Sequence, residues 1–302
     1  MQKKFKHYVE FIIVKILFFI ISKISLNSLY SFSHLFGKIF YKYFFIKKKV
    51  LFNNLRIVFK NKSSKFYNEL ALKVCINFAK TFFEFFKLNF FNKNNIDKYA
   101  KFYNLDILEN ILKKGKGVIL VSAHIDNWEF LGCALTLKGF PIVAMAKRQN
   151  NRLVDELIIK QRTGCGMQII YKGISVKDIF KALKRNKIIG IIGDVRGDEN
   201  KINSFLFGLP ASTHEGLAVF AYRTNTDIVP VFSYRDINNI HHIIFEEPIN
   251  VNKENEDTYI KDVINEYNKR LENFIRLHPD QWFYFHRRWG KISDHYYLKE
   301  FN

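Results

Sequence analysis

The sequence predicts an α/β protein with a mostly parallel β-sheet flanked by helices, preceded by an N-terminal hydrophobic helix that anchors the chain to a membrane. Two observations predict the sheet. From about Gly115 onward, short apolar runs alternate with helical stretches. These runs are continuous and rich in β-branched residues, as strands buried on both faces should be. A third observation predicts the anchor, because residues 11–21 are apolar apart from Lys15.

The length and composition agree with this class of protein. A chain of 302 residues accommodates one α/β domain with an appended segment. Hydrophobic residues make up 48% of the chain, and 32 positions are phenylalanine, so a large core can form and a disordered protein is excluded. We expect residues 1–50 to form a membrane anchor or interfacial segment and residues 51–302 to form the main domain.

The N-terminal segment leaves several interpretations open. Extending the apolar run to residues 8–29 reaches the length of a membrane-spanning helix but includes Glu10, Lys15 and Lys23. No small-residue cleavage site follows, so we do not expect a removed signal peptide. The segment is predicted to span the membrane or to lie in its interface, and a buried amphipathic helix is the alternative.

The remaining elements follow from periodicity. Residues 52–112 are predicted to be mostly helical. The predicted strands are Val118–Ser122, Ile142–Ala146, Gln168–Tyr171, Ile188–Ile192, Ile228–Tyr234 and His242–Phe245. The predicted helices between and after them span residues 127–138, 152–163, 175–186, 214–224 and 256–277.

The charge balance narrows the classes of partner. Lysine and arginine number 48 against 28 acidic residues, a net charge of +20. This excess favours anionic partners, which include phospholipid headgroups, an acidic carrier protein and nucleic acid. A basic nucleic-acid-binding protein is therefore an alternative, but no RNP, helix-turn-helix or zinc signature accompanies the charge, so we do not expect nucleic acid as a partner.

The sequence contains no pattern for a metal or a nucleotide cofactor. The three cysteines, Cys75, Cys133 and Cys165, are too few and too scattered for a disulfide framework, and no Cys/His cluster has zinc spacing. The glycines form neither a G-x-G-x-x-G motif nor a P-loop. We therefore expect a cytosol-facing body without a metal or other cofactor.

The strongest chemical signal is residues 115–132, GKGVILVSAHIDNWEFLG. A buried strand leads into His124, and a helix is predicted to begin near Asp126 or Asn127, with Glu129 in its first turn. Ligands bind where strands of α/β folds end and helices begin. This spacing allows the Glu129 carboxylate to orient the His124 imidazole as a general base. Asp126 is the local rival for that role, although we favour it as the helix cap.

Several motifs resemble one family of enzymes. AHIDNWEF resembles the H-x4-D/E motif of glycerolipid-type acyltransferases, in the N-W-E variant typical of lipid A biosynthesis acyltransferases, which add secondary lauroyl or myristoyl chains. Further segments resemble that family in the expected order over residues 115–290. They are IGD (Ile192–Asp194), FGLPA (Phe207–Ala211) with Thr213 and Gly216, IVPV (Ile228–Val231) and HPDQWFYFHRRW (His278–Trp289). One departure is Val195-Arg196, where the family usually has Gln-Asp.

The resemblance implies a glycerolipid-acyltransferase-like fold and roles for individual residues. His124 and Glu129 would be catalytic. Arg162 matches an arginine that would polarise the thioester carbonyl or its oxyanion, and a solvated arginine at a helix end is the alternative. The residues expected to contact substrate are Asn127, Trp128, Asp194, Arg287 and Arg288. The two arginines would bind phosphate. Asp194 would either contact the sugar or have a structural role.

The resemblance also implies the reaction. An acyl chain would pass directly from an acyl-carrier-protein thioester to a hydroxyl of an anionic glycolipid, a lipid A precursor, with no acyl-enzyme, metal or cofactor. The enzyme would lie at the bacterial inner membrane with its catalytic body facing the cytoplasm. Alternatives are an acyltransferase acting on another glycolipid or a lysophospholipid, and a non-catalytic membrane scaffold.

Overall fold

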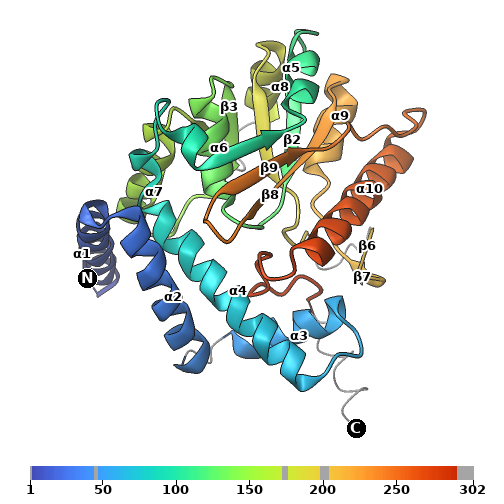
Figure 1. The fold of residues 1–302 in the computed structure, drawn as a ribbon. Coiled ribbons are helices and arrows are strands. Elements are labelled where there is room, and N and C mark those ends of the chain that lie inside the picture. The colour runs from blue at the N-terminus through green and yellow to red at the C-terminus, as the bar shows by residue number, and fades with distance from the viewer. Residues whose placement is uncertain (1, 44–46, 172–175, 198–203, 291–302) are drawn as a thin grey trace.

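A seven-stranded β-sheet forms the centre of the protein (Figure 1). The computed structural model describes residues 2–43, 47–171, 176–197 and 204–290. Across the sheet the strands are ordered β1-β9-β8-β2-β5-β3-β4, and every neighbouring pair is parallel except β8 with β9. The strands are β1 (Ala100–Tyr103), β2 (Val118–Ser122), β3 (Ile142–Ala146), β4 (Gln168–Tyr171), β5 (Ile188–Ile192), β8 (Ile228–Arg235) and β9 (His241–Phe245).

The mostly parallel sheet flanked by helices is confirmed, and the predicted strand ends differ from those of the structure by at most one residue. Residues 52–112 are mostly helical, as predicted, but β1 was not predicted among the helices there. Four residues are too few to show a periodic pattern. This strand forms by adding in parallel to the edge of the sheet, with Ala100 opposite His241.

Helices cover both faces of the sheet, because the strands carry apolar side chains on both. Along β2, Val118 and Leu120 pack into the core shared with α5 and α6, whereas Ile119 and Val121 pack into the core shared with α8, α9 and α10. These helices and α7 are α5 (Leu105–Leu112), α6 (Trp128–Leu137), α7 (Arg152–Gly164), α8 (Val176–Lys184), α9 (Gly216–Thr224) and α10 (Glu256–Leu277). A separate antiparallel hairpin consists of β6 (Ser204–Leu206) and β7 (Leu209–Ala211).

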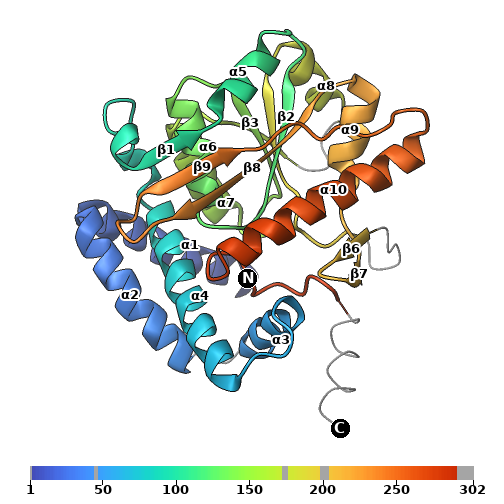
Figure 2. The ribbon, with the colours of Figure 1, turned by 45° about the vertical axis from the view of Figure 1, so that its right-hand side comes forward.

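In the described part of the chain, four further helices precede the sheet, and Figures 1 and 2 show them gathered at one end of the molecule. In α2, Gly37 allows a close approach to α4, since a Cβ at this position would lie 2.5 Å from the Cα of Ile76. The helices are α1 (Gln2–Lys23), α2 (Leu26–Tyr43), α3 (Lys48–Val58) and α4 (Ser64–Phe85), followed by two 3-10 turns, η1 (Leu88–Phe90) and η2 (Ile96–Lys98).

The predicted membrane anchor is not confirmed. Within residues 2–43, 47–171, 176–197 and 204–290, no helix is both long enough and apolar enough to cross a membrane. Large apolar side chains are nevertheless exposed along the first two helices. On α1 they are Phe5, Tyr8, Val9, Ile13, Ile16, Phe19 and Ile20, and on α2 they are Phe32, Leu35, Ile39 and Tyr43. The division into residues 1–50 and 51–302 stays a prediction.

Candidate active site

His124 and Asp194 meet at the carboxyl ends of two neighbouring parallel strands. Ser122 of β2 lies opposite Ile192 of β5, so the two residues that follow each strand are brought side by side. His124 Nδ1 lies 2.8 Å from Asp194 Oδ1, and the His124 backbone N–H donates to Asp194 Oδ2 at 3.0 Å. The crevice beyond strand carboxyl ends is where open parallel sheets bind ligands. The sheet topology therefore places a histidine–carboxylate pair at the edge where such sheets bind ligands.

The surroundings keep Asp194 ionised and favour a proton on His124. Burial raises the pKa of Asp194, but the His124 charge and hydrogen bond, with smaller contributions from His286 and Trp282, outweigh burial and hold this pKa well below its ordinary value. Burial likewise lowers the pKa of His124, but Asp194 outweighs it, with a smaller contribution from Glu129, so the net pKa is raised above 6.5. The Asp194 carboxylate is fully buried, whereas the His124 side chain is 25% exposed.

Glu129 pairs with Arg162 instead of His124, which corrects the predicted hydrogen bond between Glu129 and the imidazole. Arg162 Nε donates to Glu129 Oε2 at 2.8 Å, and Arg162 Nη2 donates to Glu129 Oε1 at 2.5 Å. Both carboxylate oxygens therefore face the guanidinium, and Asp194 takes the position at Nδ1 of His124. The alternative of a solvated Arg162 is wrong, because its side chain is only 19% exposed.

The turn between His124 and α6 is held by hydrogen bonds. Asp126 has a left-handed backbone with φ of 50°, and its Oδ2 lies 2.6 Å from His241 Nδ1. Asn127 caps α6, because its side-chain oxygen accepts from the backbone N–H of Glu129 and of Phe130. The prediction of Asp126 as the cap is therefore wrong by one residue. Since the Asn127 side chain is fully buried, a role in contacting substrate is not supported.

The segment after α10 closes the site on its other side. The backbone N–H of Phe283 donates to the carbonyl of His124 at 2.8 Å, and Ile125 forms a β-bridge with Trp282. Trp282 Nε1 donates to Asp194 Oδ2 at 2.8 Å. Sequence reasoning did not assign Trp282 to the site. Its place in the W-F-Y-F-H run, which resembles a family signature, was the available signal.

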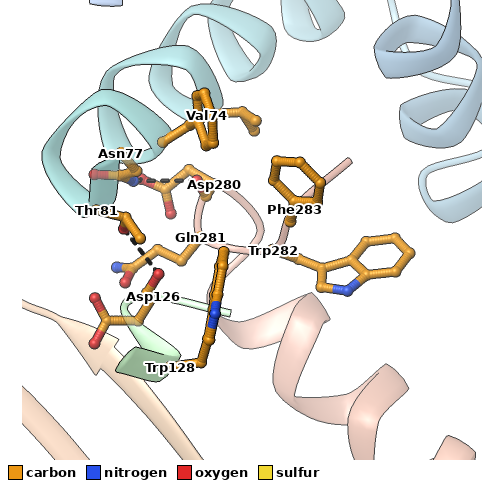
Figure 3. Close-up of a pocket in the computed structure, with 10 residues that line it drawn as sticks. Val74, Asn77, Thr81, Asp126, Trp128, Asp280, Gln281, Trp282 and Phe283 are labelled. Atoms are coloured by element: carbon orange, nitrogen blue, oxygen red, sulfur yellow. Dashed lines mark hydrogen bonds between the residues drawn. The ribbon is translucent and has the colours of Figure 1, made fainter. Parts of the chain in front are cut away.

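Trp128 borders His124. Its ring centroid lies 4.6 Å from that of His124 and 6.2 Å from that of Phe283, edge to face in both cases. A small pocket opens here between α4 and the segment 280–283 (Figure 3). It is lined by Val74, Asn77, Phe78, Thr81, Asp126, Trp128, Asp280, Gln281, Trp282 and Phe283. The predicted substrate contact of Trp128 agrees with this position but stays a prediction.

The two C-terminal arginines lie in different environments. Arg288 is fully buried, with Nη1 donating to the carbonyl of Ser212 and Nη2 to Thr213 Oγ1, both at 2.6 Å. These contacts hold the chain that follows the β6–β7 hairpin, so the predicted phosphate contact of Arg288 is not supported. Arg287 is exposed, and its predicted role in binding phosphate stays a prediction.

His286 is a second histidine near the site that sequence reasoning did not assign. Its ring centroid lies 6.4 Å from that of His124, and its ring is stacked on Phe283. Burial is the main reason that the pKa of His286 is lowered to about 4, so this imidazole is neutral near pH 7. Among the described residues, no group of three or more His, Cys, Asp or Glu side chains is arranged to hold a metal ion.

Two cysteines form a cross-link that sequence reasoning did not predict. Cys133 of α6 and Cys165, which follows α7, are joined as a disulfide with a Cα–Cα distance of 5.4 Å. They are 32 residues apart in the sequence, and the packing of α6 beside α7 brings them together. The same two helices carry Glu129 and Arg162, so a covalent bond and an ion pair connect them.

Sequence comparisons show which known proteins this chain is similar to. The sequence model of a family described as bacterial lipid A biosynthesis acyltransferase matches residues 1–291. A lipid A biosynthesis acyltransferase of Haemophilus influenzae is 23% identical over 233 residues, which cover 76% of this chain and 71% of that protein.

Proposed function

The chain belongs to the bacterial lipid A biosynthesis acyltransferase family, and from that premise we propose that it transfers a fatty acyl chain from an acyl-carrier-protein thioester to a hydroxyl of a lipid A precursor, with His124 as the general base. The observation that carries the proposal is the His124–Asp194 contact at the carboxyl ends of β2 and β5. It supplies an oriented imidazole in a partly open position.

In the proposed step, Asp194 accepts a hydrogen bond from the Nδ1–H of His124, which leaves Nε2 to take a proton from the acceptor hydroxyl. The hydroxyl oxygen attacks the thioester carbonyl and forms a tetrahedral oxyanion. Its collapse expels the carrier thiolate, which receives the proton back from His124. Asp194 stays ionised throughout, because its pKa is held low, and it stabilises the imidazolium. No acyl-enzyme is required.

Arg162 is the cation that we propose for the oxyanion. Burial lowers its pKa, but the hydrogen bonds and charge of Glu129 outweigh burial, so the guanidinium stays charged. Glu129 accepts hydrogen bonds from Nε and Nη2 of Arg162, so Nη1 lies on the side of the guanidinium away from Glu129. Glu129 therefore acts by fixing Arg162 and by adding negative charge near His124. A preorganised donor at a developing oxyanion typically contributes about 3–4 kcal/mol.

The proposal places the enzyme at the cytoplasmic face of the bacterial inner membrane, where a lipid acceptor and a soluble carrier protein meet. The exposed apolar side chains of α1 and α2 support an interfacial location. The net charge of +20 suits both anionic lipid and an acidic carrier protein.

The reaction is tested by incubating the full chain with acyl-carrier-protein thioesters and a phosphorylated tetra-acylated lipid A precursor, followed by mass spectrometry of the lipid. We expect a mass gain of one acyl group with the wild-type protein. With His124→Ala, we expect the rate to fall by about 100- to 10,000-fold, since the general base is lost.

Two outcomes would contradict parts of this proposal. Equal rates in the wild-type protein and in His124→Ala would remove His124 as the base. Acyl transfer to a lysophospholipid or another glycolipid, without transfer to the lipid A precursor, would identify a different acceptor. Lys73→Ala, at an exposed position of α4, is the matched control and should leave the rate unchanged.

A further inference from the structure

The two helices that carry Glu129 and Arg162 begin in the same way. Asn127 caps α6, and its side-chain oxygen accepts from Glu129 N at 3.1 Å and from Phe130 N at 3.0 Å. Asn151 caps α7 in the same way, through the backbone N–H groups of Leu153 and Val154. In both caps the oxygen of the asparagine is used by its own helix, so its amide nitrogen points away from that helix.

Each amide nitrogen reaches a glutamate of the N-terminal helices. Asn127 Nδ2 donates to Glu84 Oε2 of α4 at 2.7 Å. Asn151 Nδ2 donates to Glu10 Oε2 of α1 at 3.0 Å and to the carbonyl of His7 at 2.7 Å. One side chain thus caps the start of a helix and joins it to another helix through its amide nitrogen, a group that the shorter side chains of serine and threonine lack.

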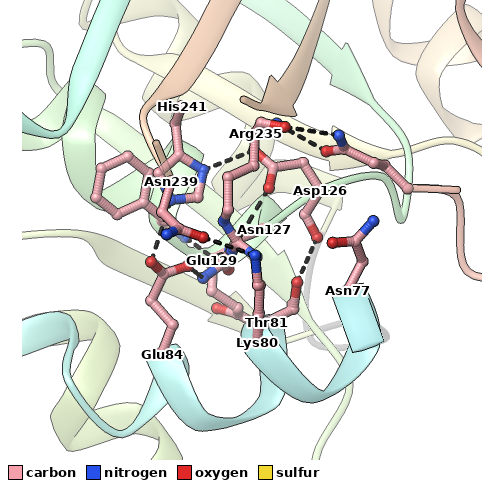
Figure 4. A network of polar contacts seen from close by, with 12 residues as sticks. Asn77, Lys80, Thr81, Glu84, Asp126, Asn127, Glu129, Arg235, Asn239 and His241 are labelled. Carbon is pink, nitrogen blue, oxygen red and sulfur yellow. Dashed lines mark hydrogen bonds and ion pairs between the residues drawn. The ribbon is translucent and has the colours of Figure 1, made fainter. Parts of the chain in front are cut away.

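Glu84 is a fixed acceptor, as Figure 4 shows. It is fully buried, and besides Asn127 it accepts from Tyr30 of α2, from Arg235 Nη2 at 2.6 Å and from His241 Nε2 at 3.1 Å. Burial raises its pKa, but Arg235 and His241 outweigh burial and hold the pKa of this carboxyl far below its ordinary value. His241 also contacts Asp126, so the network stabilises the turn after His124 through both Asp126 and Asn127.

We infer that the N-terminal helices position the Glu129–Arg162 pair through the asparagine caps, with Glu84 acting on α6 and Glu10 acting on α7. In this inference α1 is part of the catalytic framework as well as a membrane-facing helix. Glu10, Glu84, Asn127 and Asn151 are positioning residues that act through Glu129 and Arg162. The inference rests on the proposed function, because it assigns the ion pair a role in acyl transfer.

Serine substitutions separate capping from positioning. Serine caps helices about as well as asparagine, but it lacks the amide nitrogen that reaches the glutamate. Asn255 provides a matched control, since it caps α10 through Asp257 N and Thr258 N in an exposed setting, and no contact of the described residues joins its amide to another helix. The variants are Asn127→Ser, Asn151→Ser and Asn255→Ser.

With detergent-solubilised full chain we expect kcat to fall by about 10- to 100-fold in Asn127→Ser and Asn151→Ser, because displacing a reacting group by about 1 Å costs that much. KM should change little, since the ion pair acts on the transition state. Asn255→Ser should match the wild-type protein. Binding to anionic vesicles should be the same in all of them, which separates positioning from anchoring.

A charge swap gives a readout that a general loss of stability would not produce. Asn151→Asp keeps the cap but sets a second carboxylate against Glu10, so kcat should fall. Adding Glu10→Gln restores a donor opposite that carboxylate, with the contact reversed. The double variant should recover at least half of the wild-type kcat. Glu10→Gln alone should not exceed the wild-type kcat.

The outcomes distinguish the inference from the proposed function. No acyl transfer by the wild-type protein would contradict the proposed function. An active wild-type protein with equal kcat in the three serine variants would overturn the inference alone. It would also be overturned if the double variant remained as slow as Asn151→Asp.

Discussion

Gly193 lies between the last residue of β5 and Asp194, where a larger side chain has no room. A Cβ at this position would lie 2.9 Å from the buried ring of Tyr267 and 2.9 Å from Val121 Cγ2. Gly193 also donates its backbone N–H to the carbonyl of Ser122. This close approach of β5 to β2 brings the Asp194 carboxylate to His124.

At the scale of the residue, we therefore predict that Gly193→Ala lowers the free energy of unfolding by about 1–3 kcal/mol, the usual cost of overpacking a core. It should also slow acyl transfer, because Asp194 must shift. Gly216→Ala is the control, since a Cβ there meets Phe220 at an ordinary 3.5 Å. Urea denaturation of both variants checks the prediction, and equal midpoints would contradict it.

Only part of the site could be predicted from single residues. The strand that runs into His124 predicted a reactive histidine, and Arg162 was found through the family resemblance. The carboxylate that contacts His124 was assigned wrongly, because Asp194 is 70 residues away in the sequence. The contact between Asp194 and His124 depends on β5 lying next to β2 in the sheet. The pattern of residues along the sequence does not show which strands are neighbours.

At the scale of the element, two segments that resemble family signatures pack against each other. Arg288 bonds to Ser212 and Thr213, which follow β7, and Trp289 Nε1 donates to the carbonyl of Leu206 in β6. Phe207 and Gly208 both have positive φ and form the tight turn between β6 and β7. These signature residues therefore stabilise a hairpin of the fold.

We predict that Arg288→Ala lowers the free energy of unfolding by about 2–4 kcal/mol, because two buried acceptors lose a charged donor. Lys73→Ala, at an exposed position of α4, should change stability by less than about 0.5 kcal/mol. Thermal unfolding of both variants tests this difference. If Arg288→Ala raised only the KM for a phosphorylated acceptor and left stability intact, Arg288 would be a substrate contact after all.

The elements were predicted better than their contacts. Continuous β-branched runs showed where the sheet strands lie, because strands buried on both faces need them. The four residues of β1 were not predicted, because they form a strand by pairing with β9 and their local sequence has no strand pattern. The cap of α6 was misplaced by one residue, because Asp126 and Asn127 are both good caps, and the buried His241 contact decides between them.

At the scale of the whole molecule, α1 and α2, which carry the exposed apolar side chains, lie on the opposite side of the molecule from the β6–β7 hairpin (Figure 1). We predict that Ile16→Glu with Phe19→Glu weakens binding to anionic vesicles by about 10- to 100-fold, because both apolar side chains leave the interface. Phe205→Glu, on β6 and 60% exposed, is the control. Flotation with phosphatidylglycerol vesicles measures the difference. Equal binding of the wild-type protein and the Ile16→Glu, Phe19→Glu variant would argue against an interfacial α1.

The measurement that tests the central claim most directly is the pH dependence of kcat in the wild-type protein and in Asp194→Asn. In the wild-type protein the neutral form of His124 is active, so kcat should rise with pH through a pKa above 6.5. Removing the Asp194 charge lowers that pKa, so the acidic limb should move to lower pH. The plateau should fall by about 100- to 10,000-fold, as the tautomer is no longer held. An unchanged limb and plateau in Asp194→Asn would contradict the assignment of His124 and Asp194 as the catalytic pair.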